Sequence, residues 1–290
     1  MLACDAYVEK NFELWPGVLR LAAGGAAAHA AIDAAMDAAR ETASSLIADA
    51  DLVARGSLDM LPRGMAARMI PDVARTLAHA LGGLATDRAL MPPLLVALPG
   101  AVCDMVLAAM REAGPLDFAM VALGDTLAFH REAGVSLPVL PSMPLVLGEF
   151  VRALDGGVEG GVALAGQTCL FPTLGAADSV AAQGKSAALA AFIAATMADA
   201  MTLPAAKPRR TRIVDPLAAH AWEGRAVAGA SGLIPSGEIW EALSKGMKCA
   251  SALREKRLLG AAAFALKGRG RTVGSIDGDR LVRFGVSEWR

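Results

Sequence analysis

The chain has 290 residues, of which 54% are hydrophobic but only 4% aromatic, and its formal net charge is −1. Alanine carries much of the apolar content, and alanine is the best helix former, whereas a sheet normally draws on more valine, isoleucine, threonine and tyrosine. The composition therefore predicts a mainly α fold and excludes a low-complexity chain.

The cysteines and the first residues favour a cytoplasmic location. The four cysteines are far apart and form no CxxC pair. Acidic residues and Lys10 stand where a signal peptide would have an unbroken apolar stretch. The apolar window 89–103 contains three prolines, which would break a membrane-spanning helix. We expect a cytoplasmic protein with free thiols and no membrane span.

Apolar residues recur at helical spacing through the first two thirds of the chain. The clearest case lies between Pro99-Gly100 and Gly114-Pro115, where apolar side chains recur three and four residues apart. The helices expected on this basis cover 17–55, 71–81, 99–114, 116–134, 145–154 and 178–201. The glycine-rich stretch 155–161 predicts a turn, and the apolar piece after it leaves open one or two short strands.

A change in the sign of the charge divides the chain. Residues 1–205 contain 12 basic and 21 acidic residues, whereas 206–290 contain 16 basic and 8 acidic residues. Prolines and arginines gather at the boundary, as in an exposed linker. These features predict an alanine-rich, multi-helix acidic domain at 1–202, a linker at 203–216 and a basic module at 217–290.

The last part of the chain predicts a smaller α+β module. Helices are expected from Ser236 and over about 250–259. A β-hairpin is expected over 273–286, because Asp277-Gly278 suits a two-residue turn. Two helices followed by a basic hairpin are winged-helix-like, although a first helix and a third strand are not evident.

Basic side chains of this module are candidate nucleic-acid contacts. The expected hairpin would place Arg269, Arg271 and Arg280 on one face, and Lys256 and Arg257 belong to the helical part. Phosphate contact suits such a cluster, while a solvated surface is the alternative.

The first segment carries His29, Asp33, Asp37 and Glu41 four residues apart, so that they line one side of a helix. Carboxylates at this spacing can share a metal ion, but nothing identifies a second element with further ligands. We therefore interpret the stripe as a solvated face and predict no metal.

Residues 179–186 resemble the end of a phosphate-binding loop, with Gly184, Lys185 and Ser186 in place but Ser179 where the first glycine belongs. A side chain there obstructs the turn that wraps phosphate. We predict an ordinary helix start with an exposed Lys185 and no ATP or GTP binding.

These patterns favour a non-enzymatic adaptor without a cofactor. Its N-terminal domain would bind another protein, and residues 217–290 would contact nucleic acid or an acidic partner. One alternative is an enzyme with a site among the central segments near His130, Cys169 and Lys185. Another is a structural subunit of an assembly.

Overall fold

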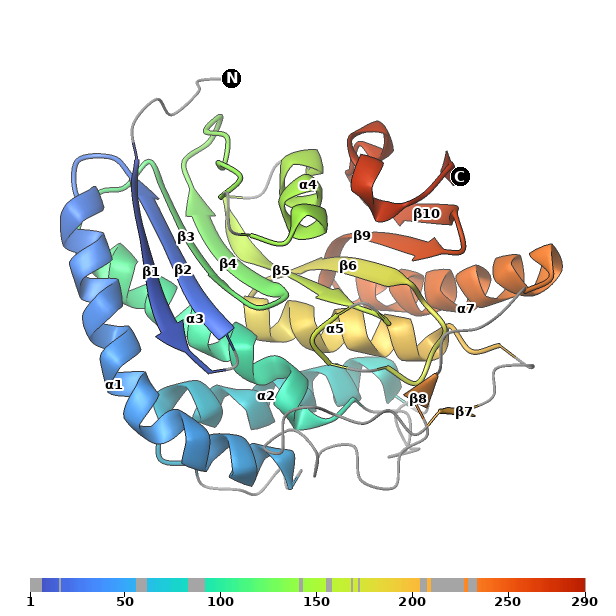
Figure 1. Cartoon of the computed structure of the whole chain (residues 1–290), viewed down its shortest axis with the longest axis horizontal. Helices are drawn as coiled ribbons and strands as arrows, with labels where there is room; N and C mark the ends of the chain where they lie inside the picture. Colours follow the sequence, from blue (N-terminus) through green and yellow to red (C-terminus); the bar gives the residue numbers. More distant parts are fainter. Residues whose placement is uncertain are drawn as a thin grey trace.

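The computed structural model contradicts the mainly α prediction, because a large sheet forms the centre of the molecule (Figure 1). The structure describes residues 7–15, 17–55, 62–82, 92–140, 143–154, 158–167, 169–171, 173–203, 208–209, 227–228 and 234–289.

The strands are β1 Val8–Leu14, β2 Gly17–Gly24, β3 Phe118–Leu123, β4 Thr126–Arg131, β5 Glu159–Ala165, β6 Ser179–Gly184, β7 Pro208–Arg209, β8 Val227–Ala228, β9 Leu259–Leu266, β10 Arg269–Val273 and β11 Glu288–Trp289. The helices are α1 Ala28–Ala54, α2 Met65–Leu81, α3 Leu98–Glu112, α4 Leu145–Ala153, α5 Ala187–Ala200 and α7 Ser236–Glu255. Short 3-10 turns are η2 Leu94–Ala97, η4 Gly278–Arg280 and η5 Val282–Phe284.

Nine strands form one sheet in the order β1-β2-β3-β4-β5-β6-β9-β10-β11. All neighbours are antiparallel except β10 and β11, which are parallel. Four helices, α1, α3, α5 and α7, cover one face, α2 packs against this helical layer, and α4 lies on the other face (Figure 1). The fold is therefore a mixed α/β structure with a helix-covered, almost wholly antiparallel sheet.

Side chains that alternate along each strand feed two separate cores. In β9, Phe264 and Leu266 join the core under the helical layer, whereas Ala263 and Ala265 join the core under α4. Strands buried on both faces lose the alternation of apolar and polar residues that identifies a half-exposed strand. The central strands therefore look like any apolar run in the sequence.

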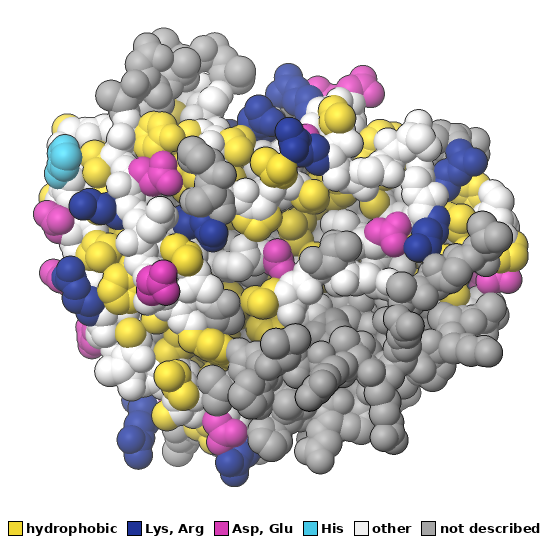
Figure 2. All heavy atoms as spheres, viewed as in Figure 1, with side chains coloured by type: hydrophobic (Ala, Val, Ile, Leu, Met, Phe, Trp, Pro, Cys, Tyr) yellow, Lys and Arg dark blue, Asp and Glu magenta, His cyan; other side chains and the backbone are white. Residues whose placement is uncertain are grey.

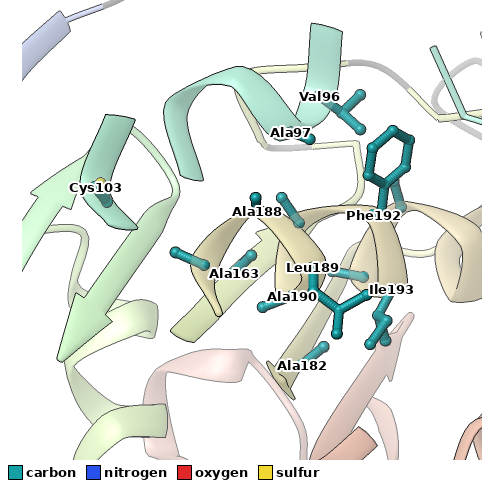
Figure 3. Packing of buried hydrophobic residues seen from close by; sticks show 14 of the residues in the cluster. Val96, Ala97, Cys103, Ala163, Ala182, Ala188, Leu189, Ala190, Phe192 and Ile193 are labelled. Carbon is teal, nitrogen blue, oxygen red and sulfur yellow. The ribbon is translucent and has the colours of Figure 1, made fainter. Parts of the chain in front are cut away.

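Alanine in this protein allows the helices to pack closely against the sheet, in addition to favouring helix formation. Small side chains such as Ala163 and Ala182 on the sheet and Ala190 on α5 gather where this helix meets the strands (Figure 3). A Cβ added at Gly161 of β5 would collide with the backbone of Ala187. The high alanine content thus reflects the closeness of α5 to the sheet. For this reason the prediction of a mainly α fold from composition was wrong.

The structure corrects several of the predicted helices, because they contain strands that are buried on both faces. The segment 116–134 is the β3–β4 hairpin, and the segments 17–55 and 178–201 each begin with a strand before the helix. The hairpin expected at 273–286 is also wrong: β9 and β10 turn at Lys267-Gly268, and Gly278 begins η4. By contrast, α3 and α4 confirm the helices predicted at 99–114 and 145–154.

The sheet continues across the predicted domain boundary. β6 precedes the expected linker and β9 follows it, yet the two strands pair, and α7 packs against α5. Most of 203–216 lies outside the described residues, so the division into 1–202, 203–216 and 217–290 stays a prediction.

One described helix, Leu94–Glu112, is long and apolar enough to cross a membrane by length and composition alone. In this structure 72% of its most apolar window is buried, and α3 contacts α1, α5, β3 and β4. It has the packing of a core helix.

Candidate functional site

An enclosed cleft with both acidic and apolar walls lies where the β3–β4 turn meets α3 and α5. Asp125, Thr126 and Thr173 supply its polar groups. Its apolar walls include Val96, Leu164, Leu170, Phe171 and Ala191. The free volume of about 20 Å³ has room for roughly one water molecule. We call this site the Asp125 cleft.

A tight turn places Asp125 at the mouth of the cleft. Gly124 adopts a φ of +57°, a conformation that glycine tolerates without strain, and lets β3 reverse into β4. The carboxylate of Asp125 accepts a hydrogen bond from the Leu170 N–H, and its backbone carbonyl accepts one from the Leu164 N–H at 2.9 Å. Burial raises the pKa of the Asp125 carboxyl, and the Leu170 bond offsets part of this increase.

A second buried carboxylate holds the other end of the loop that covers the cleft. Asp199 of α5 accepts the Leu174 N–H at 2.6 Å, and the Met201 carbonyl accepts the Ala176 N–H at 2.9 Å. The N–H groups of Leu170 and Leu174 are thus each bound by a carboxylate that lies far away in sequence.

The thiol behind the cleft is not a nucleophile. Cys103 Sγ lies 3.9 Å from Thr126 Oγ1, which donates to the Leu123 carbonyl at 2.8 Å. Burial, followed by the negative charge of Asp104, raises the pKa of the Cys103 thiol far above its ordinary value. Because only the thiolate attacks, a buried thiol of this kind is unreactive.

The strand–turn–helix at 179–200 has the layout of a phosphate-binding loop. A carboxylate of the protein itself, however, occupies the position where a phosphate would bind. Ser186 is the N-cap of α5, and its hydroxyl accepts the Leu189 N–H at 3.3 Å. Asp104 of α3 accepts the N–H groups of Ala187 at 2.7 Å and Ala188 at 2.9 Å. These are donors that a phosphate would need. Lys185 is exposed, so the predicted ordinary helix start is confirmed.

The three residues proposed for an enzyme site do not meet. His130 pairs with Glu159 at the start of β5, and Lys185 follows Gly184, which pairs with Gly161 near the same end. Cys169 lies beyond the opposite end of β5, a strand of seven residues, or about 20 Å at 3.3 Å per residue. Burial and the charge of Arg111 lower the pKa of His130.

The basic residues selected from the sequence lie on two faces. The guanidinium carbons of Arg269 and Arg271 stand 5.9 and 4.8 Å from the ring centre of Trp240 on α7. Arg280 pairs with Asp277 at 2.9 Å and donates to the Arg152 carbonyl, beside α4. The expected single face is therefore wrong, because β10 ends before Arg280.

Lys256 and Arg257 follow α7 directly. On the face that Figure 2 shows, basic and acidic side chains are interspersed over the described surface. Nucleic-acid contact by the five basic residues stays a prediction of the sequence.

The acidic stripe on α1 behaves as a solvated face. His29, Asp33, Asp37 and Glu41 are all exposed, and Asp37 pairs with Arg40 at 2.6 Å. Within the described parts of the chain, no three potential ligands come together in a way that could hold a metal ion.

Sequence reasoning missed Asp104, Asp125 and Asp199, whose partners are 25 to 84 residues away. One signal was available for Asp125, because Gly-Asp between two apolar runs is a hairpin turn pair.

Comparison with known proteins finds one matching family model. A family model described as AbpE bacteria matches residues 11–272. No curated protein matches the chain. Among solved structures, a mutant of the flavin transferase ApbE from Vibrio cholerae is 11% identical, with a TM-score of 0.48 over 96% of this chain and 99% of that chain. The family match overturns the expectation of a non-enzymatic adaptor that acts through protein–protein interaction.

Proposed function

The chain belongs to the family described as AbpE bacteria, and from this premise we propose that it is an enzyme-like protein that binds a flavin nucleotide and transfers the flavin to an acceptor. The observation that carries the proposal is the family match over residues 11–272. Flavin transfer is the activity named for the Vibrio cholerae protein, and the weak structural likeness to it adds no weight.

The Asp125 cleft is the place where we expect the flavin ring. Its apolar walls suit a flat aromatic ring, and the hydroxyl oxygens of Thr126 and Thr173, which donate their protons to backbone carbonyls, can still accept a hydrogen bond from a ring N–H. Burial raises the pKa of the Asp125 carboxyl above its ordinary value, as is common for groups at binding and catalytic sites.

A ring system requires the outer wall of the cleft to move. The cleft has room for about one water molecule, and Leu170 and Phe171 form part of its wall. Leu170 is 43% exposed, and its N–H bond to Asp125 fastens this segment. Ligand binding should therefore be coupled to whether the Asp125 carboxylate keeps its hydrogen bond from the Leu170 N–H.

The phosphates of the nucleotide are not assigned to α5. Asp104 already accepts the first two N–H groups of that helix, and its negative charge would repel a phosphate.

The test uses the full chain with FAD, FMN and ADP as separate probes. Binding is followed by flavin fluorescence anisotropy and by competition with ADP. Turnover of FAD is followed as AMP release, which must accompany transfer of the FMN part. Asp125→Asn should weaken flavin binding by about tenfold or more, whereas Asp33→Asn on the exposed face of α1 serves as the matched control. Absence of FAD and FMN binding at millimolar concentration would refute the proposal.

A further inference from the structure

A second and larger cavity lies outside the sheet, between α1, α3 and the start of α2. Its volume is about 510 Å³, within the range of small-molecule sites. We call it the α1–α3 groove. It shares no lining residue with the Asp125 cleft, so the inference below does not depend on the proposed flavin function.

The floor of the groove is apolar. Its apolar lining includes Ala38, Leu46, Met105, Ala108 and Ala109. The one buried hydroxyl there, Thr42 Oγ1, donates to the Ala38 carbonyl at 2.8 Å and lies 3.8 Å from Met105 Sδ. An aliphatic ligand can therefore rest on this floor without stripping a polar group of water.

Two carboxylates on the rim have no internal counter-charge. Glu41 of α1 and Glu112 of α3 line the groove, are exposed, and form no ion pair with any described residue. Arg40 and Arg111, their neighbours in sequence, are engaged elsewhere, since Arg40 pairs with Asp37 and Arg111 pairs with Glu159 at 2.8 Å.

The other charged groups of the groove leave an excess of negative charge. Asp49 accepts the backbone N–H groups of Arg63 at 3.0 Å and Gly64 at 2.7 Å, so it is committed to the start of α2. The Ser44 and Ser45 hydroxyls donate to backbone carbonyls of α1. Arg63 is the one basic side chain among the lining residues, and it stands against three carboxylates.

We propose that the α1–α3 groove binds a linear aliphatic polyamine. Its ammonium groups bond to Glu41 and Glu112, and its methylene stem lies on the alanine and methionine floor. The negative excess repels anions, and a bare divalent cation would gain nothing from the apolar floor. Only a ligand with both positive charges and an aliphatic chain can contact the two carboxylates and the apolar floor at the same time.

Spermidine is the probe, titrated into the full chain at low salt and followed by calorimetry. Mg²⁺ in a parallel titration supplies charge without a stem. We expect spermidine to bind at least tenfold more tightly than Mg²⁺. Glu41→Gln combined with Glu112→Gln should weaken spermidine binding by at least tenfold, while Asp33→Asn, which removes one negative charge from α1 outside the groove, should leave it within twofold.

A second variant tests the floor and keeps both carboxylates. Ala108 is exposed, so Ala108→Phe fills the groove without disturbing the core, and it should weaken spermidine binding by at least fivefold. Equal affinity for Mg²⁺ and spermidine, equal loss with Asp33→Asn, or no effect of Ala108→Phe in a chain that circular dichroism shows to be folded would each overturn the proposal.

Discussion

The contact between Asp104 and the first turn of α5 gives the sharpest stability prediction. Asp104→Ala removes both acceptors from the Ala187 and Ala188 N–H groups, which then lie buried without partners. Each hydrogen bond to a charged group contributes about 1.5–3 kcal/mol, but burial of the carboxylate opposes this and raises its pKa. We expect a net loss of about 3 kcal/mol, or roughly 6 °C in Tm at about 2 °C per kcal/mol.

Asp104→Asn separates the hydrogen bonds from the charge. The amide oxygen can still accept an N–H, so the loss should be only about 1 kcal/mol. Burial raises the folded-state pKa of Asp104 above its unfolded value. The contribution of this residue to the free energy of unfolding is therefore fully present below the unfolded pKa and is lost as pH rises through the folded pKa. Asp104→Asn should lack this part of the pH dependence.

Urea unfolding followed by circular dichroism measures all three proteins, with Asp33→Ala as the exposed control. The control should stay within about 0.5 kcal/mol of the parent chain. If Asp104→Ala cost no more than the control, the carboxylate would not be holding the start of α5, and the interpretation of this turn as a filled anion site would fail.

Three further predictions follow from the same packing. Gly161→Ala should reduce stability by more than about 3 kcal/mol or prevent folding, because its Cβ would collide with the backbone of Ala187; a normal yield and an unchanged Tm would contradict this. Lys185→Ala should leave ATP and GTP binding, measured by equilibrium dialysis, as absent as in the parent chain; micromolar binding that the variant abolishes would show a working phosphate loop. Limited proteolysis should cut first within 203–216, and the two fragments should elute together in gel filtration because β6 pairs with β9; fragments that elute separately would show independent domains.

Local signals in the sequence determined some elements correctly. Proline and glycine framed α3, and the same spacing rules placed α4. The missing first glycine favoured an ordinary helix start with an exposed Lys185 over a phosphate loop, although the helix was expected to begin at 178 rather than at Ala187. The charged stripe on α1 was interpreted correctly as a solvated face. These features depend on residues within a turn or two of one another, so a single sequence contains them.

The sheet and the candidate site were decided by the tertiary structure. β3, β5, β6 and β9 are covered on both faces, so their side chains lack the alternation that identifies a strand. The segments of β3 and β6 were therefore assigned to helices. Asp104 and Asp125 acquire their roles from N–H groups 83 and 45 residues away. Such partners are set by how α3, α5 and the β3–β4 turn pack against the sheet, and a carboxylate's pKa follows from that burial rather than from its neighbours in sequence.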